Sequence, residues 1–182
     1  MRPKSLQCRA ITLTELLIST TVVGIIMLGV ISSDYAIRKQ SDNASAGALA
    51  ALNGQGMLKH IIDNAGKAVG DKSLPGINYP NDKAWFCIRQ DINKTPIDFA
   101  DDAWICYTVV TGNLYNCAKQ PPAASPSACA DTDTLLGQVQ GIDPSFSLNN
   151  NIFSVTVTIA DPTAPGGQRS WSASVSPSGH TI

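Results

Sequence analysis

A single long apolar segment dominates the N-terminal part of the sequence. Residues Ile11 to Ile31 contain one charged side chain, Glu15. At about 1.5 Å per residue, a helix of this length covers roughly 30 Å, the thickness of the hydrocarbon core of a bilayer. The residues before it carry Arg2, Lys4 and Arg9 and no acid, which favours a cytoplasmic position for them. The pattern predicts a single-pass transmembrane helix over residues 11–31, with the rest of the chain exported.

An amphipathic pattern follows the apolar segment. Between residues 32 and 70, apolar side chains recur at a spacing of three to four, and charged side chains occupy the other faces. The apolar positions are Ile37, Ala44, Ala48, Leu52, Leu58, Ile62, Ala65 and Val69. Gly54 and Gly56 weaken the middle of this helix, where a bend or a break can form. We predict a helical continuation over residues 32–70 that Gly66 and Gly70 bring to an end.

The remaining residues, 71–182, show the period-two alternation of β-strands. The clearest strand is Phe153–Ile159, in which apolar side chains alternate strictly with Ser and Thr, so that one face is buried and the other is wet. Further candidate strands are 85–88, 104–110, 114–117, 135–140 and 171–175, with a turn signal at Gly112-Asn113. The predicted fold class is α+β: a long N-terminal helix whose amphipathic part packs on an antiparallel β-sheet head.

Composition narrows the function classes. Hydrophobic residues make up 43% of the chain, enough for a packed core, and 14 Gly and 11 Pro indicate a turn-rich domain rather than a doubly wound enzyme core. Only 15% of residues are charged and the net charge is -1, so composition gives no electrostatic footprint for duplex nucleic acid. Nucleic-acid binding is therefore not expected, although composition alone does not exclude it.

Glu15 needs an explanation, because a carboxylate inside hydrocarbon costs a few kcal/mol and should have a partner. A secretory signal peptide cleaved near Val30-Ile31-Ser32, or a plain signal anchor, leaves this residue without a role. The segment from Arg9 to Ile18, with Ala10, Ile11 and Glu15 in sequence, resembles the processing site of type IV prepilins. In that family a basic leader ends in a small residue, a hydrophobic residue follows, and Glu is the fifth mature residue.

The resemblance implies cleavage by a prepilin peptidase between Ala10 and Ile11, with Ile11 becoming the N-methylated terminus. Ala and Ile stand here where the family usually has Gly and Phe. Glu15 would pair with the N-terminal amine of a neighbouring subunit during filament assembly, and fix the axial register of the helices. The implied partners are other pilins and minor pilins, the peptidase, the inner membrane and the pilus assembly platform. The segment from Met57 to Gly66 also resembles the helix end of PilW-like minor pilins.

Removal of the predicted leader would leave four of the five cysteines, Cys87, Cys106, Cys117 and Cys129, because Cys8 lies in the leader. An even number of cysteines in an exported domain indicates two disulfides, with three possible connectivities. Neighbours in sequence favour Cys87 with Cys106 and Cys117 with Cys129. A metal site is not expected, because the chain has no CxxC motif and only 2 His.

No catalytic residues, cofactor or enzymatic activity are expected. Asp131-Thr132-Asp133-Thr134 has the spacing of an aspartate-nucleophile phosphatase motif, but it does not follow a buried strand. The resemblance instead implies a minor type IV pilin, located in the bacterial inner membrane with a periplasmic head and then in a pilus that serves adhesion, motility or DNA uptake. A pseudopilin of a type II secretion system is the alternative.

Overall fold

The structure, a computed structural model, describes residues 12–95, 98–119 and 125–180. The chain divides into two compact units, Met1–Ala44 and Ser45–Ile182. Helix α1, Leu13–Ala65, contributes to both of them. Its last third therefore belongs to the same compact unit as the β-strands, whereas the sequence placed the start of the head at residue 71.

Helix α1 is shorter at its C-terminal end than predicted, and it is uninterrupted at its centre. It runs through Gly54 and Gly56 as one helix and ends at Ala65, so the predicted continuation to residue 70 stops earlier. The reason is visible at Gly66, whose carbonyl oxygen accepts hydrogen bonds from the backbone N–H and the hydroxyl of Ser178, at 3.0 and 2.8 Å. Val69 and Gly70 then form the short strand β1, which pairs in parallel with β10, Gly179–His180.

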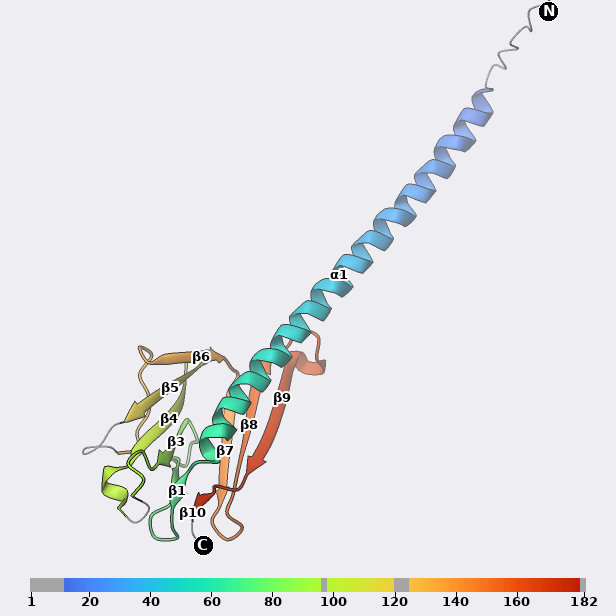
Figure 1. Cartoon of the computed structure of the whole chain (residues 1–182). Coiled ribbons are helices and arrows are strands. Elements are labelled where there is room, and N and C mark those ends of the chain that lie inside the picture. Colours follow the sequence, from blue (N-terminus) through green and yellow to red (C-terminus); the bar gives the residue numbers. More distant parts are fainter. Residues whose placement is uncertain (1–11, 96–97, 120–124, 181–182) are drawn as a thin grey trace, which may run out of the picture. The chain divides into compact units, whose positions relative to one another are not determined.

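Five antiparallel strands form the larger sheet of the second unit (Figure 1). In spatial order they are β2 (Ile77–Asn78), β3 (Trp85–Gln90), β4 (Ala103–Val110), β5 (Asn113–Lys119) and β6 (Thr134–Gln138). A two-residue turn at Thr111 and Gly112 joins β4 to β5, and both residues have positive φ, 47° and 78°. The turn thus lies one residue before the predicted Gly112-Asn113, in the conformation that two-residue hairpins favour.

Three antiparallel strands form the smaller sheet, in the order β7 (Gly141–Ser147), β8 (Ile152–Ala160) and β9 (Gln168–Val175). The alternation predicted for Phe153–Ile159 is confirmed, because Phe153, Val155, Val157 and Ile159 are all buried and the hydroxyl residues between them are not. Strand β7 was not predicted. The chain changes sheets at Val139 and Gln140, whose backbone N–H groups donate to the carbonyl oxygens of Gly112, in the turn between β4 and β5, and of Thr158 in β8.

The C-terminal third of α1 packs on both sheets, and this is where the core of the second unit lies (Figure 1). The buried helix residues are Ala50, Gly54, Met57, Leu58, Ile61 and Ala65. A Cβ added at Gly137 of β6 would meet the Met57 sulfur at 3.0 Å, and one added at Gly54 would meet the Trp171 ring of β9 at 2.6 Å. The predicted arrangement, a long helix packed on antiparallel strands, is therefore confirmed, with two sheets rather than one.

A buried polar group also ties the helix to the larger sheet. The hydroxyl oxygen of Tyr107, a fully buried residue of β4, lies 2.8 Å from the Asn64 side-chain nitrogen, which donates to it, and 3.1 Å from Nδ1 of His60. Gln90 of β3 donates to the side-chain oxygen of Asn64 at 3.1 Å. Burial raises the pKa of the Tyr107 hydroxyl well above its usual value. The hydroxyl is therefore neutral and acts as a hydrogen-bonding group.

Candidate functional site

The first turn of α1 holds the most informative polar contacts of the first unit. The Glu15 carboxylate accepts hydrogen bonds through Oε2 from the backbone N–H and the hydroxyl of Thr12, each at 3.1 Å. In return, the Glu15 backbone N–H donates to the Thr12 hydroxyl oxygen at 3.3 Å. This is a capping box, in which the side chains at the N-cap and at the third helical position satisfy each other's backbone N–H groups. Glu15 thus has a local partner in its own helix, and its Oε1 accepts no hydrogen bond from any described residue.

The apolar segment that follows has the properties of a membrane span. Its most apolar 18-residue window has a mean hydropathy of 2.2 and is not buried within the structure. Its hydroxyl groups donate to backbone carbonyls of the preceding turn, so they are compatible with a hydrocarbon environment. These groups belong to Ser19, Thr20, Thr21, Ser32 and Ser33, with distances of 2.8 to 3.0 Å. The chain therefore carries one helix, among the described residues, that is long and apolar enough to cross a membrane once.

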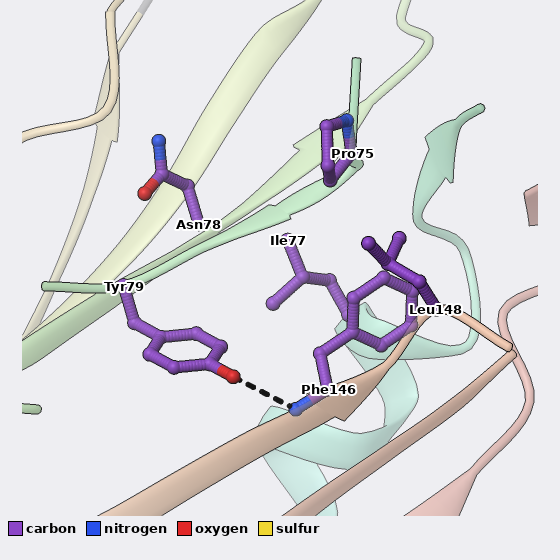
Figure 2. A pocket seen from close by; sticks show the side chains of 6 residues that line it. All are labelled: Pro75, Ile77, Asn78, Tyr79, Phe146 and Leu148. Carbon is purple, nitrogen blue, oxygen red and sulfur yellow. Dashed lines mark hydrogen bonds between the residues drawn. The ribbon is translucent and has the colours of Figure 1, made fainter. Parts of the chain in front are cut away.

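The second unit has a shallow apolar pocket where the two sheets meet (Figure 2). Its volume is about 300 Å³, at the lower end of the range for ligand pockets. The lining residues are Pro75, Ile77, Asn78, Tyr79, Phe146 and Leu148. The backbone N–H of Phe146 donates to the Tyr79 hydroxyl at 3.2 Å, which joins β7 to the residue that follows β2.

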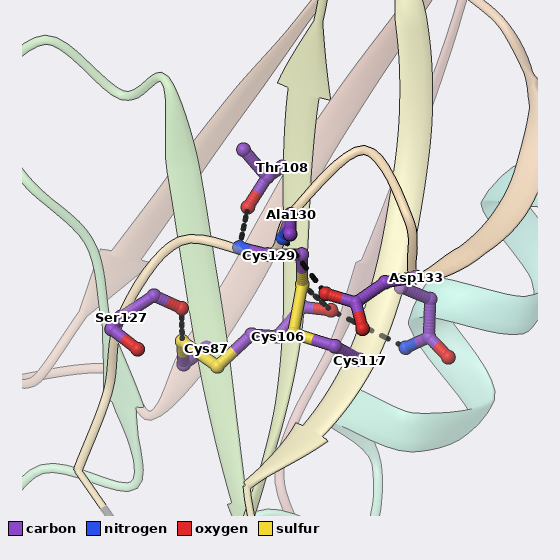
Figure 3. The surroundings of a disulfide bond; sticks show 9 residues. Cys87, Cys106, Thr108, Cys117, Ser127, Cys129, Ala130 and Asp133 are labelled. Atoms are coloured by element: carbon purple, nitrogen blue, oxygen red, sulfur yellow. Dashed lines mark hydrogen bonds between the residues drawn. A yellow bond between two sulfur atoms is a disulfide. The ribbon is translucent and has the colours of Figure 1, made fainter.

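The two disulfides lie together in the larger sheet (Figure 3). One joins Cys87 of β3 to Cys106 of β4, which are direct neighbours in the strand register, and the other joins Cys117 of β5 to Cys129. These are the two pairs that neighbouring positions in the sequence favour. Cys106 also lies opposite Cys117 in the register, so position across the strands alone would not have distinguished the observed pairing from a Cys106–Cys117 bond.

The second disulfide anchors the segment that leads into β6. The backbone N–H of Cys129 donates to the Thr108 hydroxyl oxygen at 2.7 Å in a buried position, and that of Ala130 donates to the Asp133 carboxylate at 2.8 Å (Figure 3). Cys117, Cys129 and Asp133 bring possible metal-ligand atoms within 4.8 Å of one another. The two sulfurs are joined to each other, however, so they are not the thiolates that a metal requires. Asp133 therefore acts here as a turn-forming residue.

Arg89 of β3 and Asp102, the residue before β4, form a buried ion pair in the larger sheet. The Arg89 guanidinium donates to the backbone carbonyls of Val69, at 3.2 Å, and Leu74, and its carbon lies 4.1 Å from the centre of the Phe99 ring. The Asp102 carboxylate lies 3.8 Å from Arg89 Nε, and its side chain is 1% exposed. Burial raises the pKa of Asp102, although the nearby guanidinium opposes the shift. Arg89 thus holds the segment between α1 and β2 against the sheet.

No family model, curated protein or solved structure matches this chain. The assignment of function therefore depends on the residues themselves.

Of the predicted site residues, Glu15 lies in the first turn of α1, and the four cysteines form two disulfides. Ala10 and Ile11, the predicted cleavage and methylation positions, lie outside the described residues. Thr12, the partner of Glu15, was not among the predicted site residues. The signal was available, because Thr12-Leu13-Thr14-Glu15 has the spacing of a capping box directly before an apolar run.

Proposed function

We propose that the chain is a minor type IV pilin, a structural subunit that joins other pilins in the inner membrane and is then incorporated into a pilus. Glu15 carries the proposal, because it is the only charged residue between Ile11 and Ile31 and it occupies the first turn of an exposed apolar helix. A carboxylate within an apolar membrane helix is costly unless a cation pairs with it. The N-terminal amine that cleavage before Ile11 would create on a neighbouring subunit is such a cation.

The geometry of the first turn is compatible with this role. The capping box uses Glu15 Oε2, while Oε1 accepts no hydrogen bond from a described residue and can receive an amine. An ion pair of this kind is desolvated in a bilayer, so its main effect is to fix the register of packed helices rather than to add stability. The two disulfides fit an exported head, since such bonds persist in oxidising compartments.

The proposal is tested by separating the charge of Glu15 from its hydrogen bonds. Glu15→Gln removes the charge and keeps an oxygen that can cap the helix, so membrane insertion is expected to be normal and incorporation into sheared surface filaments to be lost. Asp34→Asn is the control, because Asp34 is an exposed acid of the same helix that pairs with Arg38 at 2.9 Å. Normal incorporation of Glu15→Gln, or a purified wild-type protein that does not begin at an N-methylated Ile11, would refute the proposal.

A pseudopilin of a type II secretion system has the same N-terminal requirements and is the second candidate. Recovery of the protein in sheared surface pili favours the pilus, whereas loss of exoprotein secretion in a deletion strain favours the pseudopilus. A role in direct DNA binding is less favoured, because removing Arg2, Lys4 and Arg9 with the leader makes the net charge about -4.

A further inference from the structure

The outer edge of β9 lacks the protection that the other edges of the two larger sheets have. Edge strands are commonly blunted by being short, by Pro, by charge or by a bulge. Strand β2 has two residues, β6 pairs with β5 through a register shift, and β7 contains Pro144 and the charged Asp143. In contrast, β9 has eight residues, and its one charged side chain, Arg169, lies near its start and pairs with Asp161 at 3.0 Å. The rest of the strand, from Ser170 to Val175, contains no Pro, no charge and no irregularity in its pairing with β8.

From Ser170 to Val175, the backbone groups of β9 that pair with no described strand belong to its serines. Asp161 N–H donates to the Gly167 carbonyl at 2.9 Å at the start of the β8–β9 ladder, and bonded and non-bonded pairs alternate from there. This alternation makes Ser170, Ser172 and Ser174 members of non-bonded pairs, so the N–H and C=O of each point away from β8. Their hydroxyls lie 2.6 to 2.8 Å from Ser154, Thr156 and Thr158, consistent with the closer side chains of non-bonded pairs.

The surroundings of this edge define the chemistry of a strand that would fit it. On the outer face the serines belong to rows of paired hydroxyls that a further strand with Ser or Thr would extend. On the helix side, beyond Ala173, lies a pocket of about 200 Å³ that is also lined by Gln55, Leu58, Lys59, Ile62 and Asp63. Lys59 and Asp63 pair with each other at 2.6 Å, so the lining carries no net charge, and Leu58, Ile62 and Ala173 offer an apolar surface to a side chain.

We propose that β9 is a strand-addition site for an extended, uncharged segment of another protein in which hydroxyl and apolar side chains alternate.

A second copy of this chain fits the β9 edge less well than such a segment. Contacts of Gly47 with Thr163, Gly54 with Trp171 and Gly66 with Val175 show that α1 and β9 run in the same direction. A two-fold pairing of β9 with β9 would therefore point the two helices in opposite directions, whereas copies anchored in one membrane are expected to be parallel. The inference does not depend on the proposed pilin function.

The test uses the full chain in a mild detergent and a synthetic peptide with the sequence of Phe153–Ile159, which already pairs with β9 as part of β8. Amide hydrogen exchange is measured at β9. At a peptide concentration about nine times Kd, exchange at the amides of Ser170, Ser172 and Ser174 is expected to slow about tenfold. Exchange at Trp171 and Ala173, whose N–H groups point toward β8, is expected to change little.

Three controls make the result specific to strand pairing. A peptide with Pro in place of Thr156 and Val157 loses donors on both of its edges and should give no protection. In the protein, Ser172→Pro removes an outward N–H and should abolish the effect, while Ser145→Ala on β7 should preserve it. Absence of protection, or equal protection by the proline peptide, would overturn the proposal. Protection without peptide that rises with protein concentration, together with a dimeric mass, would overturn it in favour of a second copy.

Discussion

Because Gly54 of α1 lies against the Trp171 ring and Gly56 does not, substitution by Ala is expected to change the free energy of unfolding differently at these two glycines. A Cβ at position 54 would lie 2.6 Å from Cε3 and Cζ3 of Trp171, whereas a Cβ at Gly56 has no atom within 4 Å. Carbon atoms normally approach to about 3.5 to 4.0 Å. The ring would therefore have to move by about 1 Å to accommodate Gly54→Ala.

The magnitudes follow from helix propensity and overpacking. Gly→Ala in a helix interior stabilises by about 1 kcal/mol, and this is the whole effect expected for Gly56→Ala. Gly54→Ala gains the same amount but loses about 1 to 3 kcal/mol through overpacking, so it is expected to be neutral or destabilising by up to about 2 kcal/mol. The free energy of unfolding is measured by urea titration of the full chain in a non-denaturing detergent, with near-UV circular dichroism as the signal.

Replacement of Trp171 completes a double-mutant cycle that tests the contact directly. In a Trp171→Ala background the obstruction is gone, so Gly54→Ala should stabilise by about 1 kcal/mol, as Gly56→Ala does. If Gly54→Ala proves as stabilising as Gly56→Ala in the presence of Trp171, the close packing of helix and ring is wrong.

Three further predictions concern other parts of the chain. Thr12→Ala removes the N-cap and should lower the stability of the first turn of α1 by about 1 kcal/mol, so that its amide hydrogens exchange about fivefold faster in micelles. Thr12→Ser keeps the capping hydroxyl and should leave this exchange unchanged. The double variant Cys117→Ser with Cys129→Ser opens a loop with a sequence separation of 12 and should lower the free energy of unfolding by about 3 kcal/mol; an unchanged urea midpoint would contradict this. Hydrogen bonds from Thr163 lower the pKa of Asp161 in the folded protein. The ionised carboxylate therefore stabilises the fold above the pKa of the unfolded chain, and this part of the free energy of unfolding is lost as the pH falls through the lower pKa of the folded protein. Melting temperatures at about pH 5 and about pH 3 measure this loss, which Asp161→Asn should remove.

Hydrophobic periodicity predicted the long helix and most of the strands, because these elements bury one face and expose the other. It missed β7, in which Ile142, Pro144 and Phe146 alternate with polar residues, since Pro usually argues against a strand. An edge strand tolerates Pro where no ladder bond is needed. Periodicity also gave no sign that the chain changes sheets at Val139 and Gln140, because that division depends on which strands become neighbours in space.

The glycines of α1 illustrate a second limit of sequence reasoning. Propensity treats Gly54 and Gly56 alike, as weak points of a helix, yet only Gly54 meets another element. Its lack of a side chain serves the packing of Trp171, which lies more than a hundred residues away in the sequence. At the N-terminus the reverse holds, since the partner of Glu15 is three residues away and is readable from the spacing alone.

The six buried residues of α1, from Ala50 to Ala65, also decide where the head can be cut from the membrane segment. A fragment that begins at Ser45 keeps the part of the helix that packs on both sheets. A fragment that begins at residue 71, where the strands take over in the sequence, leaves Phe86, Tyr107 and Phe153 without the helix that covers them, and is expected to aggregate. A soluble version of this head is therefore expected to need the part of α1 from Ala50 to Ala65 that carries the buried residues.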